Sequence, residues 1–199
     1  NILSDITEFE FVYRIDFRLR PDPGMTPLAI STNAAENYYF GLGQNWERAA
    51  LIRSRYICGD KISYEIFYNI LKKFIWRPTL DFFAIDDIKS IKNQIDVTQK
   101  SSFKSLLGYN IKIGRGGIRE IEFYVHILQL IWGGKYQNLQ SNNLIESVNS
   151  LYTNNLIQLS VKEVLINNYY KLRNLENRIQ MLENNQSHSI PQDKEIYIK

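Results

Sequence analysis

The 199-residue sequence has a single cysteine, Cys58, so it cannot form a disulfide within the chain. Disulfide frameworks are typical of oxidising compartments, and their absence fits the reducing cytosol. Cys58 follows Tyr56-Ile57 at the end of an expected helix. We therefore predict a cytoplasmic protein in which this thiol packs in the interior and is not a nucleophile.

The sequence also lacks a strong excess of charge and a long hydrophobic run. Its 24 Lys and Arg residues against 21 Asp and Glu residues give a net charge of +3, which is too small to indicate a nucleic acid or an anionic membrane as partner. No apolar stretch reaches the roughly 20 residues that a membrane-spanning helix needs, and no signal peptide is visible. The composition, 44% hydrophobic and 23% charged, predicts a soluble globular protein.

Glycine is not abundant, with ten residues in all, and three of them stand close together. Gly114, Gly116 and Gly117 lie in Lys112-Ile-Gly-Arg-Gly-Gly-Ile-Arg-Glu-Ile-Glu-Phe123, directly before an amphipathic helix. Glycine lets the backbone adopt positive φ and approach a ligand closely, and a helix start presents free N–H groups to phosphate. A tight loop before a buried helix explains the same glycines about as well, because a short glycine turn is a weak signal.

A second unusual segment, Val12-Tyr-Arg-Ile-Asp-Phe-Arg-Leu-Arg-Pro21, alternates apolar and charged residues with the period of a β-strand. Its polar face places Asp16 among arginines that include Arg18 and Arg20. Nearby positive charge keeps a carboxylate ionised, so Asp16 could ligate Mg²⁺ while the arginines hold phosphate oxygens. An exposed strand face whose charges pair with each other is the simpler explanation of this segment taken alone.

The remaining pattern predicts a β-containing front and a helical bundle behind it, with a boundary near residues 77–105. The front contains a strand over Glu8–Leu19, a turn at Pro21-Asp-Pro-Gly24 and a short strand over Leu28–Ser31. Helices are expected from a cap at Thr32 or Asn33 to Phe40, over Trp46–Cys58, Ser63–Trp76 and Asp86–Val97, from Gly117 to Gly133, and over 143–154 and 160–186, with a polar loop at 98–110.

Five motifs follow one another along the chain. They are Tyr13-Arg-Ile-Asp-Phe-Arg-Leu-Arg-Pro21, Trp46-Glu-Arg-Ala-Ala-Leu-Ile-Arg-Ser-Arg55 with Gly59-Asp60, Lys112–Phe123, Gln129-Leu-Ile-Trp-Gly-Gly134 and Leu172-Arg-Asn-Leu-Glu-Asn-Arg-Ile-Gln180. In this order they resemble the bifunctional glutamine synthetase adenylyltransferase/adenylyl-removing family. Each half of such an enzyme is a nucleotidyltransferase domain followed by a helical domain. The resemblance thus implies an α+β chain, in which residues 1–80 are the C-terminal part of a nucleotidyltransferase domain with short strands. Residues 81–199 would form a helical bundle of the glutamine synthetase adenylyltransferase/uridylyltransferase type.

In this family one half adds AMP from ATP to a tyrosine of glutamine synthetase, and the other removes it by phosphorolysis and releases ADP. The runs Gly114–Glu120, Leu130–Gly134 and Phe74–Asp81 are similar to the removing half. The transferring half typically has Thr-Asp in place of Arg119-Glu120. The resemblance therefore implies the N-terminal, adenylyl-removing half of a regulator of nitrogen metabolism. The adenylylating half and a non-catalytic module that docks glutamine synthetase are the alternatives.

The resemblance also implies site residues and partners. Asp16 matches the third metal carboxylate of the nucleotidyltransferase site, which binds Mg²⁺. The other expected site residues are Arg18 and Arg20 in catalysis, and Lys112, Gly114, Gly116, Gly117 and Arg119 in binding ATP, ADP or phosphate. Glutamine synthetase is the expected partner protein, and a PII-type nitrogen signalling protein is a further candidate.

The sequence departs from the family in its metal carboxylates. The first two form an Asp-x-Asp motif upstream of the Asp16 strand, and no such motif precedes Asp16 here. One carboxylate cannot hold two Mg²⁺ ions in a defined geometry, and Asp86-Asp87, at an expected helix start, is not a substitute. Our hypothesis is that this chain alone is catalytically inert or requires an upstream piece.

Several further side chains have no single role in the sequence. Glu120 and Glu122 can orient Arg119 or contact metal-bound water, and ion pairs between helices explain them equally well. His126 stands where the family usually has glutamine, and neither it nor His188 is assigned a role.

Overall fold

A computed structural model describes residues 8, 15–78, 86, 107–183 and 187–191 of the chain. This part is mostly helical. Its helices are α1 (Thr32–Gly41), α2 (Asn45–Leu51), α3 (Lys61–Ile75), α5 (Ile118–Trp132), α6 (Leu144–Thr153) and α7 (Leu159–Glu183), with a short 3-10 helix η1 (Gln137–Leu139).

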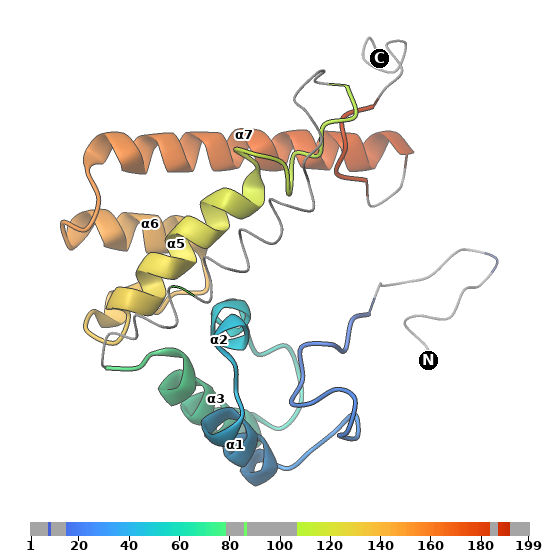
Figure 1. Cartoon of the computed structure of the whole chain (residues 1–199), viewed down its shortest axis with the longest axis vertical. Helices are drawn as coiled ribbons and strands as arrows, with labels where there is room; N and C mark the ends of the chain where they lie inside the picture. Colours follow the sequence, from blue (N-terminus) through green and yellow to red (C-terminus); the bar gives the residue numbers. More distant parts are fainter. Residues whose placement is uncertain (1–7, 9–14, 79–85, 87–106, 184–186, 192–199) are drawn as a thin grey trace.

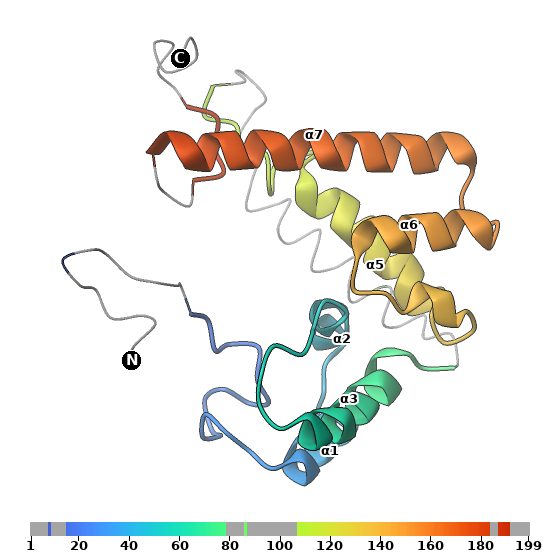
Figure 2. The ribbon, with the colours of Figure 1, turned by 180° about the vertical axis from the view of Figure 1, so that it is seen from behind.

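The helices form two groups, an amino-terminal group of α1–α3 and a carboxyl-terminal group of α5–α7 (Figures 1 and 2). In the first group α1 and α2 pack on α3, and in the second α5, α6 and α7 pack against one another. Contacts between α2 and α5 join the groups. Leu130 of α5 belongs to the same hydrophobic core as Tyr39 and Phe74, so the two groups share part of one interior.

The amino-terminal group begins its helices at polar caps. The hydroxyl of Ser31 accepts a hydrogen bond from the Ala34 N–H at 3.2 Å, and the Asp60 carboxylate accepts one from the third residue of α3 at 2.7 Å. Caps of this kind satisfy N–H groups that have no partner within the helix. The prediction of Thr32 or Asn33 as the first cap was wrong, because Ser31 is the last extended residue and its hydroxyl reaches the helix start.

Two charged residues of the Trp46–Arg55 motif are buried in this group. Glu47, 2% exposed, accepts hydrogen bonds from the Gln44 N–H at 2.8 Å and the Tyr38 hydroxyl at 3.1 Å. Arg48, 1% exposed, donates from Nε and Nη2 to the carbonyl of Ile75 at 3.3 and 3.1 Å. Since buried charges need such partners, both side chains hold α2 to its neighbours. Arg48 also provides hydrogen-bond donors for the carbonyl of the last residue of α3.

The carboxyl-terminal group has a continuous apolar core between α5, η1 and α6. The side chains with no exposed surface in this core are Val125, Leu139, Val148 and Leu151. Gln129 lies beside them, 1% exposed, and its amide donates to the Leu139 carbonyl and the Ser147 hydroxyl at 2.6 and 2.9 Å. Each buried apolar side chain contributes about 1.5–3 kcal/mol relative to its exposure.

Gly133 and Gly134 allow the end of α5 to cross the end of α3. A Cβ atom on Gly133 would lie 2.5 Å from the Trp76 ring, and one on Gly134 would overlap the Arg77 carbonyl. Only glycine permits so close an approach. The double glycine therefore ends α5, as the sequence predicted, and also lets the two helix groups meet.

The predicted strands are not found in the described residues. Residues 9–14 lie outside them, and residues 15–19 and 28–31 form no strand. A strand needs a neighbour for its N–H and C=O groups, and within the described ranges the β pairing is a single bridge between Asn110 and Ser189. The α+β prediction is therefore supported only for its helical part, while the turn after Pro21 is present, with Met25 and Thr26 N–H groups bonded to the Asp22 carbonyl.

Helix positions agree well with prediction in the carboxyl-terminal group and less well in α2. The structure confirms the helices predicted after Gly117, over 143–154 and from 160 onward, within one residue at these ends. Residues 184–186, where the last helix was predicted to end, lie outside the described residues. The helix predicted over Trp46–Cys58 ends at Leu51. Cys58 is consequently exposed in the loop before α3, and the prediction that it packs was wrong. The prediction for Asp86–Val97 lies outside the described residues, apart from Asp86.

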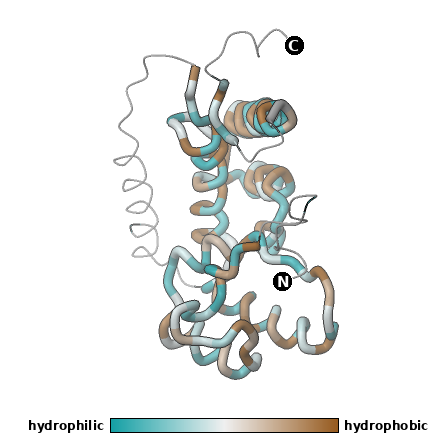
Figure 3. The backbone as a smooth tube through the Cα atoms, turned by 90° about the vertical axis from the view of Figure 1, so that its right-hand side faces the viewer, coloured by the Kyte–Doolittle hydropathy of each residue, from teal (hydrophilic) through white to brown (hydrophobic). Residues whose placement is uncertain are grey.

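Hydrophilic and hydrophobic residues alternate along the helices (Figure 3). None of the helices in the described part of the chain is both long and apolar enough to cross a membrane.

Candidate functional site

The Asp16 carboxylate pairs locally with Arg18. It accepts hydrogen bonds from the Arg18 backbone N–H at 2.9 Å and from its guanidinium at 3.0 and 2.5 Å. Both side chains are exposed, 52% for Asp16 and 88% for Arg18. The pKa of Arg18 is raised, first by this hydrogen bond and then by the carboxylate charge. These two predicted catalytic residues thus form a surface ion pair, the pairing that the sequence segment taken alone favoured.

Arg20 is the third predicted catalytic residue, and it holds the following turn together. Its Nη1 donates to the carbonyls of Thr26 and Pro27 at 2.6 and 2.7 Å, and its Nη2 donates to the Pro23 carbonyl at 2.7 Å. A guanidinium bonded to three carbonyl oxygens of its own loop has few donors left for phosphate. In the described structure the Arg20 guanidinium therefore stabilises the turn that follows it.

The glycine turn at residues 107–117 is packed closely on itself. Gly114 and Gly117 have no room for a Cβ atom, which would lie 2.5 Å from the Tyr109 ring and 2.6 Å from the Ile111 carbonyl, respectively. Gly116 has φ +77°, in the left-handed region that favours glycine. The predicted glycines are therefore required by the shape of the turn.

The N–H groups at the start of α5 are already bonded within the chain. Ile118 and Arg119 donate to the carbonyls of Ile111 and Lys112 at 3.0 and 2.9 Å. Glu120 caps the turn, because its carboxylate accepts a hydrogen bond from the Gly116 N–H at 3.0 Å. The expectation that this helix start offers free N–H groups to phosphate is wrong for these positions, and a phosphate there would have to be bound by side chains.

A strap formed by residues 187–191 covers the glycine turn. Its Ile190 exchanges hydrogen bonds with the turn, as the Gly108 N–H donates to the Ile190 carbonyl at 2.8 Å and the Ile190 N–H donates to Tyr109 at 2.9 Å. Ile190 also packs with Ile111 and with Ile179 of α7 in a small apolar core. The turn is thus fixed between α5, α7 and the strap.

A chain of charged and histidine side chains runs from the strap across α7 and α5 to the segment after α2, and we name it the α5–α7 network. Its members are Lys112, His188, Glu176, Arg173, Glu122, Arg53 and His126. Arg173 lies at its centre and pairs with Glu122 at 2.7 Å and with Glu176 at 2.6 Å. Glu122 also lies 3.3 Å from Arg53. Of the three roles that the sequence left open for Glu122, the structure shows ion pairs between helices.

The two histidines of the α5–α7 network both have a lowered pKa. Burial, and then the Arg53 cation whose Nε lies 3.4 Å from the ring, lowers the pKa of His126 to about 4. Burial and the Lys112 ammonium lower the pKa of His188, and the Glu176 carboxylate partly offsets them. His188 contacts Glu176 at 2.9 Å and Lys112 at 3.3 Å, so a neutral ring can donate to the carboxylate and accept from the ammonium.

The predicted site residues fall into two separate places. The segment of residues 15–20, drawn in blue, lies beside α1–α3, whereas the glycine turn lies at the carboxyl-terminal end of α7 in both views (Figures 1 and 2). Among the described residues, no group of three Asp, Glu, His or Cys side chains is arranged to hold a metal ion. Asp16, exposed and paired with Arg18, is a single carboxylate and does not by itself form the Mg²⁺ site that the resemblance implies.

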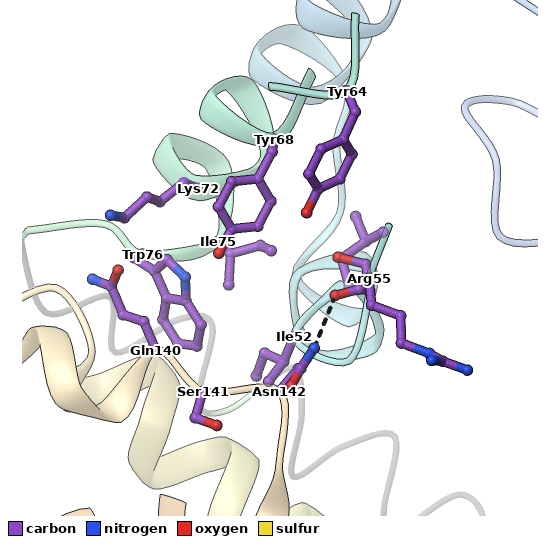
Figure 4. A pocket seen from close by; sticks show the side chains of 12 residues that line it. Ile52, Arg55, Tyr64, Tyr68, Lys72, Ile75, Trp76, Gln140, Ser141 and Asn142 are labelled. Atoms are coloured by element: carbon purple, nitrogen blue, oxygen red, sulfur yellow. Dashed lines mark hydrogen bonds between the residues drawn. The ribbon is translucent and has the colours of Figure 1, made fainter. Parts of the chain in front are cut away.

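The structure also contains a cleft of about 200 Å³ between the two helix groups, which the sequence analysis did not predict. It is lined by the end of α2, by Tyr64, Tyr68 and Lys72 of α3, by Trp76, and by residues 140–142 (Figure 4). The spacing of four between Tyr64, Tyr68 and Lys72 places them on one helix face. That spacing is the sequence signal that could have indicated the cleft, although its opposite wall comes from a distant segment.

Two protein families match parts of the chain. The family described as Glutamate-ammonia ligase adenylyltransferase matches residues 1–69, and the family described as GlnD PII-uridylyltransferase matches residues 89–198.

Bifunctional glutamine synthetase adenylyltransferase/adenylyl-removing enzymes are similar to this chain over nearly its whole length. The enzyme of Brucella melitensis is 45% identical over 198 residues, which is 100% of this chain and 20% of that enzyme. Those of Bartonella quintana and Rhizobium meliloti are each 46% identical over 96% of this chain, and 20% and 19% of their own lengths are covered. The chain therefore spans only 20% of the length of such relatives. These matches confirm the resemblance carried by the five motifs. Over its whole length the chain is similar to glutamine synthetase adenylyltransferases, and through residues 89–198, more than half of its length, it belongs to the family described as GlnD PII-uridylyltransferase.

Proposed function

We propose that this chain is part of the adenylyl-removing half of a bifunctional glutamine synthetase adenylyltransferase. The reaction would remove AMP from the adenylylated tyrosine of glutamine synthetase by phosphorolysis. The observation that carries this choice is the pair Arg119-Glu120 in the first turn of α5, directly after the glycine turn, where the transferring half typically has Thr-Asp. Glutamine synthetase would be the protein substrate, a PII-type protein a further partner, and the cytoplasm the compartment.

In that reaction an oxygen of inorganic phosphate attacks the phosphorus of the AMP group. The bond to the tyrosine oxygen breaks, ADP leaves, and the tyrosine oxygen takes up a proton. Positive side chains stabilise the negative charge that develops on the transferred group. Asp16 would contribute one ligand to Mg²⁺, and the other carboxylates would come from sequence outside this chain.

The side chains of the glycine turn support a role in holding phosphate. Arg115 and Arg119 are exposed, and neither forms a hydrogen bond or ion pair through its guanidinium within the described part of the chain. Lys112 stands near them, with its ammonium set by His188. Because the backbone N–H groups are occupied, we propose that these cations bind phosphate through their side chains, with guanidinium forks suited to its oxygens. Gly114, Gly116 and Gly117 would shape the turn that presents them.

The division of the chain is part of the same proposal. Residues 1–80 would belong to the nucleotidyltransferase domain and residues 81–199 to the helical domain. The two family matches, which end at residue 69 and begin at residue 89, support a boundary between them.

A non-catalytic docking module is the second candidate. The observation that favours it is the pairing of Asp16 with Arg18 at the surface, together with the lack of an acidic cluster among the described residues. The adenylylating half is the third, and Arg119-Glu120 argues against it.

The deciding experiment incubates AMP-tyrosyl glutamine synthetase with inorganic phosphate, Mg²⁺ and this chain, and follows ADP release. A parallel reaction adds the upstream segment of the Brucella melitensis enzyme. We expect no release from the chain alone and release once the upstream segment is present. In a companion reaction with unmodified glutamine synthetase, ATP and Mg²⁺, formation of AMP-tyrosine would show the adenylylating half. Binding of glutamine synthetase with no turnover in either reaction would show the docking module.

Two variants make the assay specific to the proposed site. Asp16→Asn should abolish ADP release, since it removes a metal ligand while keeping the size of the side chain. Asp22→Asn is the matched control, because it changes a nearby carboxylate at a position with φ +40°, a conformation that asparagine also adopts. Equal rates in the two variants would contradict the role of Asp16.

A further inference from the structure

The cleft between the two helix groups contains polar groups without partners. The hydroxyls of Tyr64 and Tyr68 and the indole N–H of Trp76 form no hydrogen bond within the described part of the chain. Both hydroxyls point into the space between α3, Trp76 and Asn142 (Figure 4). Donors of this kind bond to water in the free protein, and ligand oxygen atoms can take the place of that water.

The deep side of the cleft is apolar. Ile52, Ile75 and Trp76 are 5%, 3% and 8% exposed, and we name these three residues the apolar floor. Small-molecule sites typically combine such a surface with a few polar groups that fix the orientation of the ligand. The cleft has both components within about 200 Å³, which admits a small molecule and not a folded segment.

The charged side chains that line the cleft, among the residues that the structure describes, are both cations. Arg55 and Lys72 lie on opposite sides of the opening, and neither has an ion pair or hydrogen bond to its charged group in the ranges that the structure describes. Among the described residues no carboxylate lines the cleft, and the Glu146 carboxylate accepts a hydrogen bond from the hydroxyl of Ser141, a lining residue, at 2.6 Å. Figure 4 shows both charged ends directed outward past the rim, where long side chains can turn toward a bound anion. The opening therefore attracts negative charge.

We propose that this cleft binds a small organic anion. Its carboxylate or phosphate accepts hydrogen bonds from Tyr64 and Tyr68 and lies between Arg55 and Lys72. Its ring or short aliphatic part lies on the apolar floor. Because α2, α3 and the loop before α6 all contribute, the bound molecule contacts both helix groups and holds them together. The site is separate from Asp16 and from the glycine turn, so it stands or falls independently of the phosphorolysis proposed above.

The test uses phenyl phosphate as the probe and the 199-residue chain labelled with ¹⁵N. The chain has three tryptophans, at 46, 76 and 132, and only Trp76 lines the cleft. We expect saturable shifts of the Trp76 indole N–H signal while the other two stay in place. Benzyl alcohol, which has the ring without the charge, and inorganic phosphate, which has the charge without the ring, should each bind about tenfold more weakly.

Matched variants decide whether the named residues bind the probe. Lys72→Ala should weaken binding about threefold, as for an exposed charge, and Tyr68→Phe about fivefold through the lost hydroxyl. Lys73→Ala changes the neighbouring exposed lysine, which does not line the cleft, and should leave binding unchanged. Equal weakening by Lys72→Ala and Lys73→Ala, equal affinity for benzyl alcohol, or equal shifts of all three indoles would each overturn the proposal.

Discussion

The Asp16–Arg20 segment and the α5–α7 network are both arrays of opposite charges, but the structure uses them differently. The segment pairs residues two positions apart, Asp16 with Arg18, at the surface. In the network Arg173 pairs with a residue 51 positions away, and Lys112 contacts one 76 positions away. Exposed local pairs contribute little to stability because water screens them. The comparison teaches that charges with a regular sequence pattern need not hold the fold, while scattered charges can.

The largest expected difference between the two regions comes from their glycines. Gly117→Ala, beside the network, places a Cβ atom 2.6 Å from the Ile111 carbonyl and 2.7 Å from the Gly114 carbonyl. Since backbone must move, we expect a loss of about 3 kcal/mol in the free energy of unfolding. Gly24→Ala, in the turn after Asp16, meets its nearest atom at 3.9 Å and should change stability little. Urea unfolding measures the stability of both variants. Equal urea midpoints for Gly117→Ala and Gly24→Ala would contradict the expected difference between the two regions.

The next largest effect is a dependence of the free energy of unfolding on pH, which we expect from His126 in the α5–α7 network. Its pKa is about 4 in the folded chain, below the 6.5 of the free side chain. The unfolded chain therefore binds more protons, and the stability present above pH 6.5 is lost as the pH falls toward 4. From pH 7 to pH 5 the loss is about 2 kcal/mol. Urea midpoints at both pH values measure it.

The matched variant for this prediction is His126→Gln, which keeps a polar side chain that cannot titrate. It should lose about 2 kcal/mol less than the wild-type chain between pH 7 and pH 5. The carboxylates titrate equally in both proteins, so the difference isolates the histidine. Parallel pH profiles would show that the His126 ring is solvated and outside the network.

Much of the fold followed from local patterns. Helical periodicity and the flanking glycines predicted α5 within one residue of its observed ends, and α6 and α7 nearly as well. The failures involve contacts from far along the chain. The helix at Trp46 stops at Leu51, and the side chain of Arg53 beyond it contacts Glu122 and His126 on α5. Nothing in the pattern of residues 46–58 carries that information.

The candidate site was harder to predict than the fold. The sequence indicated a turn at the glycines before α5, but it could not show that Glu120 caps this turn or that residues 187–191 cover it. The motif residues Glu47 and Arg48 have charged side chains that suggest exposure, and both are buried as partners of backbone and tyrosine groups. The residues around Asp16 alternate between apolar and charged as in a strand, but a strand also requires a second segment to pair with. Residues 15–19 form no strand in the structure.

A smaller effect is expected at the carboxylate between Arg173 and His188. Glu176→Gln removes a nearly buried charge whose two contacts are 2.6 and 2.9 Å long, and we expect a loss of about 1–2 kcal/mol in the free energy of unfolding. The pKa of His188 should fall further, because Glu176 raises it. An NMR titration of the ring measures this shift. Glu163→Gln, an exposed change on the same helix, is the control and should alter neither quantity.

The smallest effect should come from the charge pair that the sequence displays most clearly. Asp16→Asn weakens the contact with Arg18, but both side chains face water, and the Arg18 N–H keeps an amide oxygen to bond. We expect no measurable change in the urea midpoint, in low or high salt, while the same variant abolishes ADP release in the reconstituted assay. That combination of results would show that Asp16 is needed for the reaction and not for the stability of the fold. A midpoint shift as large as that of Glu176→Gln would instead show that the segment belongs to the folded framework, and the contrast between the two charge arrays would fail.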